Sequence, residues 1–139
     1  MNIQTRKKAR QYIIQALYSW QISKNDIIDI EHQYMKNINQ QQVDITYFHE
    51  LITKITLKYQ YLDKIISLYI NRKLEKIDQI EKAILRLSFY EMIYKLNIPN
   101  KVLINESIEL AKRFGSKYSY KFINGVLDKA VNNIRLKKK

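Results

Sequence analysis

The sequence predicts an all-α protein of about seven helices in two small packed helical bundles. Its 139 residues contain two Gly and one Pro, too few for a sandwich or barrel, which has a turn signal every ~8–12 residues. Apolar residues make up 46% of the chain and recur at helical spacing, so a disordered chain is excluded. This length suits one domain with its own core. We expect residues 1–139 to form a single domain with halves of about 1–70 and 78–139, divided near residues 71–77.

The N-terminal half is predicted to contain three helical segments. Thr5 is the expected N-cap of the first helix, which runs to about Ile22. A short helix opens at Asp26, and a long helical stretch opens at Asp44 and continues through Tyr69. Helical spacing gives the first helix an apolar face made of Ala9, Ile13, Ala16, Leu17 and Trp20.

The C-terminal half is predicted to surround a buried central helix. The run DQIEKAILRLSFYEMIYKL, which opens at Asp78 and ends before Pro99, is apolar nearly all round. A sharply amphipathic helix follows, with inner positions Leu103, Ser107, Leu110, Ala111 and Phe114. We expect Gly115 to adopt the left-handed conformation just past this helix and Ser119 to cap the last helix.

The net charge of +12 is concentrated at the two ends of the chain. Residues 1–24 carry five basic residues and no acidic one, and residues 107–139 carry nine basic residues against two acidic ones. Residues 25–106 are neutral, with eleven residues of each sign. If the composition were simply basic throughout, residues 25–106 would also carry a net positive charge. The distribution therefore favours a polyanionic partner, and nucleic acid over a membrane surface.

The start of the first helix is basic where helix electrostatics favour acidic residues. Arg6, Lys7 and Lys8 fall in the expected first turn, and Arg10 follows. The partial positive charge of a helix N-terminus disfavours each by ~0.3–1 kcal/mol at low salt. The cluster therefore indicates a phosphate-binding site, with a solvated arm as the alternative. The terminal RLKKK follows a helix end, where cations are favoured, and is interpreted as a solvated tail.

Two aromatic residues lie off the predicted core faces and beside basic residues. Tyr18 projects on the side of Lys7, and Phe122 follows Lys121. Such a combination suits single-stranded nucleic acid, because bases stack on rings while phosphates pair with cations. Packing of either ring against another helix is the alternative.

No residue pattern predicts catalysis, a metal site or a cofactor. The chain has no Cys, and His32 and His49 lie beside neither a Ser nucleophile nor carboxylates at ligand spacing. The sequence has no glycine-rich phosphate loop, no apolar run of membrane-spanning length and no signal-peptide core. We therefore expect a noncatalytic, cytoplasmic protein without a membrane partner.

Three segments resemble the NusB family of transcription antitermination factors. They are RKKARQYIIQALYSWQIS at 6–23, IEKAILRLSFYEM at 80–92 and VLINESIELAKRFGSKYSYKFINGVLDKA at 102–130. Each short motif is weak alone, but ALYSWQ, AILR, INES/IELAK and KFINGVLD in this order are specific, and the likeness runs through essentially the whole chain. The resemblance implies an all-α protein of two helical bundles with a noncatalytic RNA-binding role in bacteria.

The resemblance also implies partners and site residues. NusB-like proteins pair with the ribosomal protein NusE and bind the single-stranded boxA element of nascent RNA. With other Nus factors they keep RNA polymerase elongating through ribosomal-RNA operons. The RNA-binding positions of the family map onto Arg6, Lys7, Lys8, Arg10, Tyr18, Lys121 and Phe122. The NusE-facing surface maps near Glu75 and Glu81, although Glu81 also fits a capping box with Asp78. We expect the isolated protein to be a monomer or a weak homodimer.

Lys117 and Tyr118 depart from the family pattern, in which acidic residues often occupy the loop before the last helix. The departure makes this predicted RNA face more positive, and Lys117 is therefore included among the expected RNA-binding residues. Non-specific RNA binding is expected to be stronger and fine sequence discrimination by the loop weaker.

Three other functions are each compatible with part of the sequence. A NusB-like module also occurs at the N-terminus of some ribosomal-RNA methyltransferases, but here no Gly-rich nucleotide fold follows before Lys139. The basic first helix also has the charge to lie on an anionic membrane. A helix-turn-helix DNA binder is compatible with the composition, but no three- or four-residue turn places the basic cluster on a second helix.

Overall fold

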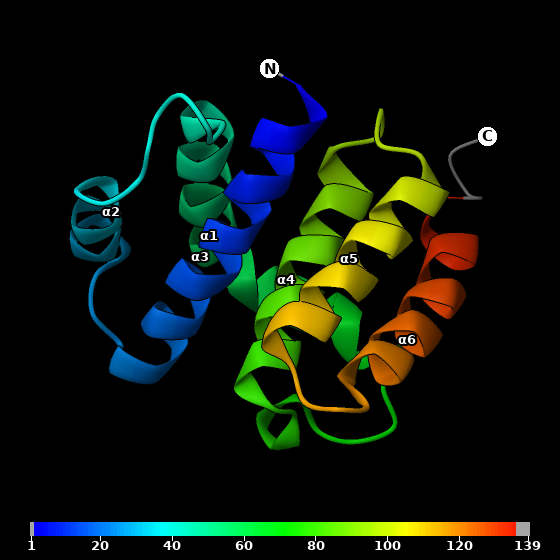
Figure 1. The fold of residues 1–139 in the computed structure, drawn as a ribbon. Coiled ribbons are helices and arrows are strands. Elements are labelled where there is room, and N and C mark those ends of the chain that lie inside the picture. The colour runs from blue at the N-terminus through cyan, green and yellow to red at the C-terminus, as the bar shows by residue number, and fades with distance from the viewer. Residues whose placement is uncertain (1, 136–139) are drawn as a thin grey trace. The chain divides into compact units, whose positions relative to one another are not determined.

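The computed structural model describes residues 2–135, which form six α-helices and one 3-10 turn (Figure 1). The elements are α1 (Ile3–Ser23), α2 (Ile27–Met35), α3 (Ile45–Ser67), η1 (Leu74–Lys76), α4 (Gln79–Tyr94), α5 (Asn100–Phe114) and α6 (Ser119–Ile134). The all-α fold class is confirmed, with a helix count close to the one expected. The chain divides into two compact units, Met1–Lys58 (unit 1) and Tyr59–Lys139 (unit 2). The predicted division at 71–77 lies within unit 2.

Unit 1 joins the start of α1 to the start of α3 through one buried acid. The backbone N–H of Asp44 donates to the carbonyl of Thr5 over 3.1 Å, and Arg6 Nε lies 3.2 Å from Asp44 Oδ2. The other carboxylate oxygen accepts a hydrogen bond from the N–H of Tyr47 at 3.0 Å. Asp44 therefore caps the beginning of α3, as predicted, and binds α1 at the same time.

The first helix begins earlier than predicted. Asn2, rather than Thr5, is its N-cap, and the Asn2 side chain accepts a hydrogen bond from the N–H of Thr5 at 2.9 Å. The Thr5 hydroxyl donates back to the Asn2 carbonyl over 2.9 Å. Arg6, Lys7 and Lys8 consequently follow the first turn, beyond which the helix dipole has little effect. Helix electrostatics alone therefore do not mark these three cations as a phosphate site.

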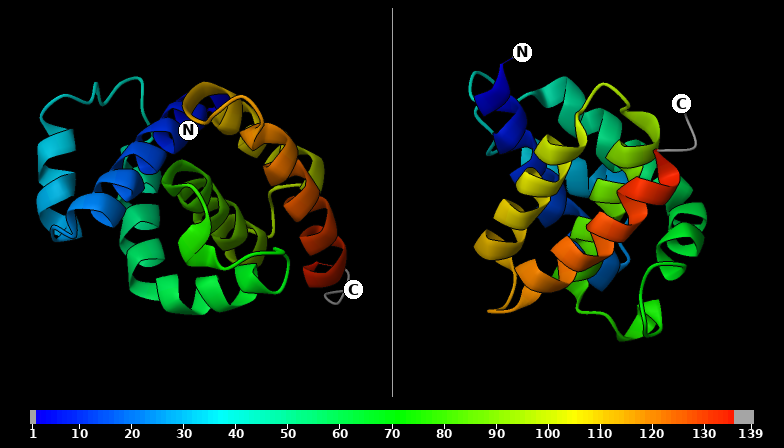
Figure 2. Two further views of the ribbon diagram at one scale, coloured as in Figure 1. Left: turned by 90° about the horizontal axis from the view of Figure 1, so that it is seen from below. Right: turned by 90° about the vertical axis from the view of Figure 1, so that its right-hand side faces the viewer.

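Unit 2 is built around α4, which is buried as its sequence predicts. Every residue from 83 to 92 is buried, and Asp78 caps the helix by accepting hydrogen bonds from the N–H groups of Ile80 and Glu81. The antiparallel helices α5 and α6 lie side by side, and both pack on α4 (Figures 1 and 2). The core of the unit includes the fully enclosed side chains of Ile84, Leu85, Phe89, Leu103, Ile123 and Leu127.

Polar side chains on α4 are matched by partners on neighbouring helices. The Arg86 guanidinium forms two hydrogen bonds with the Asp63 carboxylate of α3, at 2.9 and 2.7 Å. The hydroxyl groups of Ser88 and Ser107 lie 2.7 Å apart and link α4 to α5. Because an unpaired buried polar group costs ~1–3 kcal/mol, these pairs restrict which faces of the helices can meet.

The connection between α5 and α6 differs from its prediction at two residues. Gly115 is extended, with φ −91° and ψ −175°, rather than left-handed. A glycine is required there by space, because a Cβ would lie 2.7 Å from the Ala111 carbonyl oxygen and 2.7 Å from the Ser119 side chain. Ser119 is the first residue of α6 and not its cap, which is Tyr118. The Ser119 hydroxyl instead donates to Glu81 Oε2 over 2.7 Å.

Arg135 closes the C-terminal end of α4. Its guanidinium donates to the carbonyl of Met92 at 3.1 Å and to those of Glu91 and Lys95 at 3.2 Å. The last carbonyls of a helix lack partners within the helix, so Arg135 satisfies groups that would otherwise need water. The prediction of a solvated tail is wrong for Arg135, and residues 136–139 of that segment lie outside the described residues.

The two glycines provide a matched test of this packing. Gly115→Ala should lower the free energy of unfolding by ~1–3 kcal/mol, because the added methyl group overlaps its neighbours. Gly125→Ala should raise it by roughly 0.5–1 kcal/mol, because Gly125 lies within α6 and an added Cβ would have no neighbouring atom within 4 Å. Urea unfolding of both variants measures the two changes, and effects of the same sign would contradict the assignment.

Candidate nucleic-acid interface

Arg6 and Arg10, which were predicted to bind RNA, are engaged within unit 1. The Arg6 guanidinium pairs with Asp44 and lies 3.7 Å from the centroid of the Tyr47 ring. Arg10 is only 5% exposed, and its guanidinium lies 5.9 Å from the same ring centroid. Arg10 precedes the buried Ile13 by three residues, a spacing that could have placed it on the inner face. Both arginines therefore contribute to the packing of α1.

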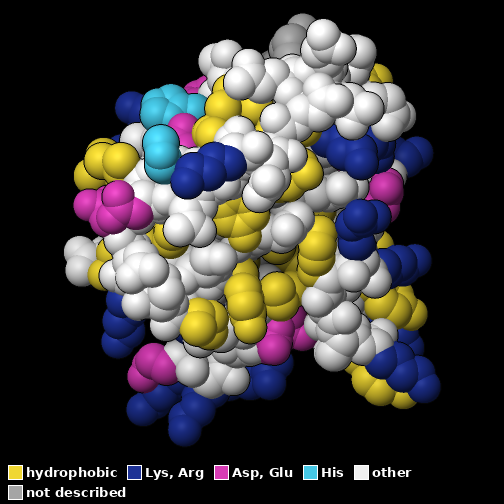
Figure 3. Space-filling view, turned by 60° about the vertical axis from the view of Figure 1, so that its left-hand side comes forward, with side chains coloured by type: hydrophobic (Ala, Val, Ile, Leu, Met, Phe, Trp, Pro, Cys, Tyr) yellow, Lys and Arg dark blue, Asp and Glu magenta, His cyan; other side chains and the backbone are white. Residues whose placement is uncertain are grey.

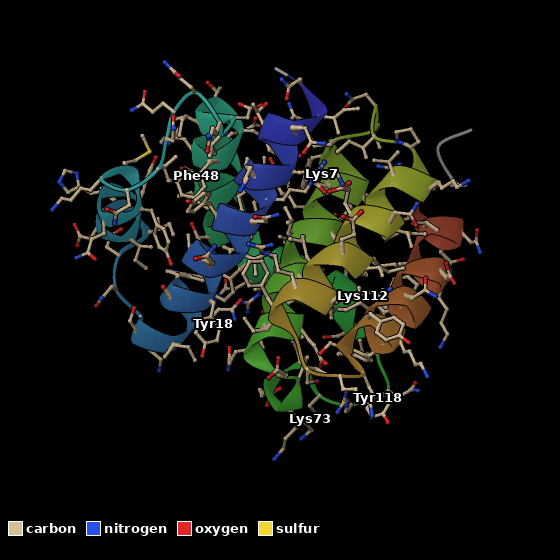
Figure 4. The ribbon with its side chains drawn as sticks, viewed as in Figure 1. Lys7, Tyr18, Phe48, Lys73, Lys112 and Tyr118 are labelled. Carbon is tan, nitrogen blue, oxygen red and sulfur yellow. The ribbon has the colours of Figure 1, made fainter. Side chains whose placement is uncertain are left out.

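The exposed polar side of α1 carries the other predicted residues of this unit. Lys8 is exposed and Lys7 is half-buried. Tyr18 is 39% exposed and lies further along the same helix (Figure 4). Its ring borders a hollow of about 320 Å³ between α1 and α2, together with Ile22 and Tyr34. Lys8 supplies an accessible cation, and Tyr18 supplies an accessible ring.

The α2 side of unit 1 has the opposite character. His49 Nδ1 lies 2.6 Å from Glu31 Oε2, and Figure 3 shows histidine side chains beside acidic ones on this face. Carboxylates disfavour phosphate, so this face is a poor candidate for RNA. Across the described part of the chain, no group of three His, Cys, Asp or Glu residues could hold a metal ion.

The loop between α5 and α6 and the first turn of α6 present two exposed lysines around an exposed ring. The Nζ atoms of Lys117 and Lys121 lie 5.4 and 5.6 Å from the centroid of Tyr118. Tyr118 is 61% exposed at the end of unit 2 where α5 connects to α6 (Figure 4). Lys117 and Lys121 are among the predicted site residues, whereas the sequence marks Tyr118 only as a departure from the family pattern. Its exposed, cation-flanked ring adds it to the candidate site.

Phe122 is neither a free ring nor a core residue. It is half-buried, and the Arg72 guanidinium lies 5.0 Å from its ring centroid. The ring borders a hollow of about 320 Å³ that is also lined by Tyr69, Gly125 and Lys129. Arg72 was not predicted as a site residue, because nothing in its local sequence indicates that the 71–77 connection lies over α6.

The two acidic residues mapped to a protein partner have different surroundings. Glu75 lies exposed on η1. Glu81 is 8% exposed, and its carboxylate accepts the hydrogen bond from Ser119. Burial and, secondarily, Arg86 lower the pKa of Lys82, while Asp63 and Glu75 oppose this shift. Because Glu75 is exposed and Glu81 is buried, Glu75 is the accessible acid of the two. Glu81 is an internal group that fixes the start of α6.

No described helix combines the length and the apolar character that crossing a membrane requires. This observation concerns residues 2–135 alone.

Comparison with known proteins identifies close relatives. Residues 7–132 match the model of the NusB family. The transcription antitermination protein NusB of Buchnera aphidicola subsp. Baizongia pistaciae is 56% identical over 131 residues, 94% of this chain and 91% of that protein. The protein of the same name from Erwinia tasmaniensis is 52% identical and the match covers 96% of both chains.

Solved structures share the fold. T. maritima NusB has a TM-score of 0.83 at 27% identity, covering 95% of this chain and 94% of that chain. A chain in the crystal structure of antitermination factors NusB and NusE in complex with dsRNA has a TM-score of 0.82 at 23% identity, covering 94% and 98%. Because the family match spans most of the sequence and relatives about half identical cover nearly all of it, the chain belongs to the NusB family of transcription antitermination proteins.

Proposed function

We propose that this protein binds the boxA element of nascent ribosomal-RNA transcripts together with the ribosomal protein NusE. In this role it supports processive elongation by RNA polymerase, alongside other Nus factors, in the cytoplasm and without catalysing a reaction. Family membership supports the proposal, as does a solved relative that assembles with NusE and dsRNA. The RNA bound here is proposed to be single-stranded, because exposed rings are useful where bases are unpaired.

The observation that carries the proposal is the unbalanced positive charge around Tyr118. Residues 110–127 contain four basic and four aromatic residues and no acidic residue. Among the described residues, the ammonium groups of Lys117 and Lys121 have no carboxylate partner. Phosphates of RNA would provide the missing counter-charge, and binding would release the counterions that balance it in solution.

Unit 1 would add a second set of contacts. Lys8 is accessible to a phosphate and Tyr18 to a base. Arg6 and Arg10, which the sequence placed in the same role, support α1 through Asp44 and Tyr47. We propose that their effect on RNA binding is exerted through the position of α1.

NusE is proposed to contact the exposed carboxylate of Glu75. With 13 acidic residues against 25 basic ones, the chain offers few acids to a basic ribosomal protein, so an accessible carboxylate is valuable for recognition. The buried Glu81 would affect partners indirectly, because its hydrogen bond fixes Ser119 next to Tyr118.

A titration of the full chain with RNA tests the proposal directly. A boxA-like RNA and a scrambled RNA of the same length are each titrated with and without NusE, at a stated salt concentration. We expect tighter binding of the boxA-like RNA, and a larger preference when NusE is present. Equal affinity for both RNAs under both conditions would contradict boxA recognition.

Substitutions of Lys8 and Arg6 should distinguish a direct RNA contact on α1 from an indirect effect through the stability of unit 1. Lys8→Gln should flatten the dependence of log affinity on log salt by roughly 0.7, the value for one phosphate contact with a single strand, and leave stability unchanged. Arg6→Gln should lower the free energy of unfolding by ~1–3 kcal/mol, because it removes the charged partner of buried Asp44. Anisotropy titrations at several salt concentrations and urea unfolding measure both effects. The opposite pattern, with Lys8 affecting stability alone, would overturn these roles.

Glu75 and Glu81 should likewise separate partner binding from stability. Glu75→Lys should weaken NusE binding by about tenfold without changing stability, because it reverses an exposed charge. Glu81→Ala should cost ~1–3 kcal/mol of stability, because it leaves the Ser119 hydroxyl without its acceptor. Calorimetric titration with NusE and thermal unfolding supply the two measurements. Normal NusE binding by Glu75→Lys would remove Glu75 from the interface.

A further inference from the structure

Tyr118 combines a highly exposed ring with two nearby cations. Its ring is 61% exposed, with Lys117 and Lys121 Nζ at 5.4 and 5.6 Å from the centroid. Tyr61 is 52% exposed on α3, but no cation lies over its ring among the contacts that the structure describes. Tyr120 has one lysine, Lys112, at 4.9 Å and is half-buried.

The backbone beneath Tyr118 is held firmly although its ring is free. The neighbouring Ser119 is 1% exposed, and its hydroxyl donates to Glu81 and accepts a hydrogen bond from the N–H of Ser116 at 3.0 Å. Gly115 cannot accept a Cβ without displacing Ser119. A ring that projects from a fixed backbone loses little conformational freedom when it binds a ligand.

The chemistry of the cluster matches one nucleotide step of a single strand. A cation near an exposed, solvated ring is attracted to it only weakly, so both ammonium groups can turn to nearby phosphates. Tyr118 is the N-cap of α6 and Lys121 lies in the first turn of that helix, which brings Lys121 Nζ to 5.6 Å from the centroid of the ring. A base can then cover the ring while phosphates on either side meet the lysines.

We infer that Tyr118 is a stacking platform for a nucleobase of single-stranded RNA, with Lys117 and Lys121 binding the flanking phosphates. The inference rests on the proposed RNA-binding function and adds to it a residue and a mode of contact. Because every base has an aromatic face, the contribution of Tyr118 should be similar for all four bases. The α5–α6 loop would thus increase affinity for RNA without selecting its sequence.

The test uses the full chain, with and without NusE, and two ten-nucleotide probes. One probe is a single-stranded RNA of mixed sequence, and the other has the same backbone with abasic positions throughout. Tyr118→Ala should bind the mixed RNA about 5- to 150-fold more weakly and the abasic probe as tightly as the parent. Tyr118→Phe should restore binding, and Tyr61→Ala, the matched exposed tyrosine, should bind normally.

Salt dependence distinguishes the ring from the lysines. Tyr118→Ala should leave the slope of log affinity against log salt unchanged, because no charge is removed. Replacing Lys117 and Lys121 with Gln should flatten the slope by about 1.4, at roughly 0.7 for each phosphate contact. Thermal unfolding of each variant should match the parent, because these side chains are exposed.

Two further outcomes have distinct meanings. The stacking role would be overturned if Tyr118→Ala lost the same factor of affinity for the mixed and the abasic probes, or lost affinity for neither. RNA binding by the parent would still stand in both cases. Failure of the parent to bind the mixed RNA, with and without NusE, would overturn the sequence-independent stacking role, whereas the proposed function is overturned only if the parent also fails to bind the boxA-like RNA.

Discussion

The burial of α4 is the constraint on which unit 2 depends. A helix that is apolar nearly all round is stable only when neighbouring helices cover it, and α5 and α6 both pack on it. The buried polar groups of α4 then determine how the neighbouring helices α3, α5 and α6 are oriented on it. Arg86 requires the Asp63 carboxylate, Ser88 requires the hydroxyl of Ser107, and Glu81 accepts its hydrogen bond from Ser119. Hydrophobic burial provides the stability, and these pairs specify the arrangement.

The buried helix α4 also influences the geometry of the candidate RNA site, through Glu81. The hydrogen bond between Glu81 and Ser119 fixes the first residue of α6, and the lack of space at Gly115 fixes the end of α5. Tyr118 lies between Gly115 and Ser119, so the backbone of the loop that carries Lys117 and Tyr118 is fixed at both ends. An acidic residue that the family resemblance placed at a protein interface thus acts, in this chain, on the geometry of the loop proposed to bind RNA.

The sequence was most informative where local chemistry decides the structure. Asp78 and the apolar run after it predict the start and the burial of α4 correctly, because capping and periodicity are local signals. Gly115 was assigned the wrong conformation, because only the folded structure shows that Ser119 occupies the space beside it. The spacing of Arg10 to Ile13 indicates the inner face of α1, but its contact with the Tyr47 ring joins segments that are distant in the sequence, and so do the contacts that leave Tyr118 exposed. The basic character of the site was therefore predictable, whereas the partners of its side chains and the exposure of Tyr118 were not.

The proposed contact between RNA and the loop around Tyr118 is central to the function of the protein. It is tested most directly by NMR, following the backbone amide signals of the labelled chain bound to NusE as a single-stranded boxA-like RNA is added. The largest chemical-shift changes are expected at residues 117–121, with further changes near Lys8 and Tyr18. The amide signals of Glu31 and His49, on the acidic side of unit 1, should remain in place. Changes confined to Glu31 and His49, with residues 117–121 unaffected by bound RNA, would contradict the proposed contact.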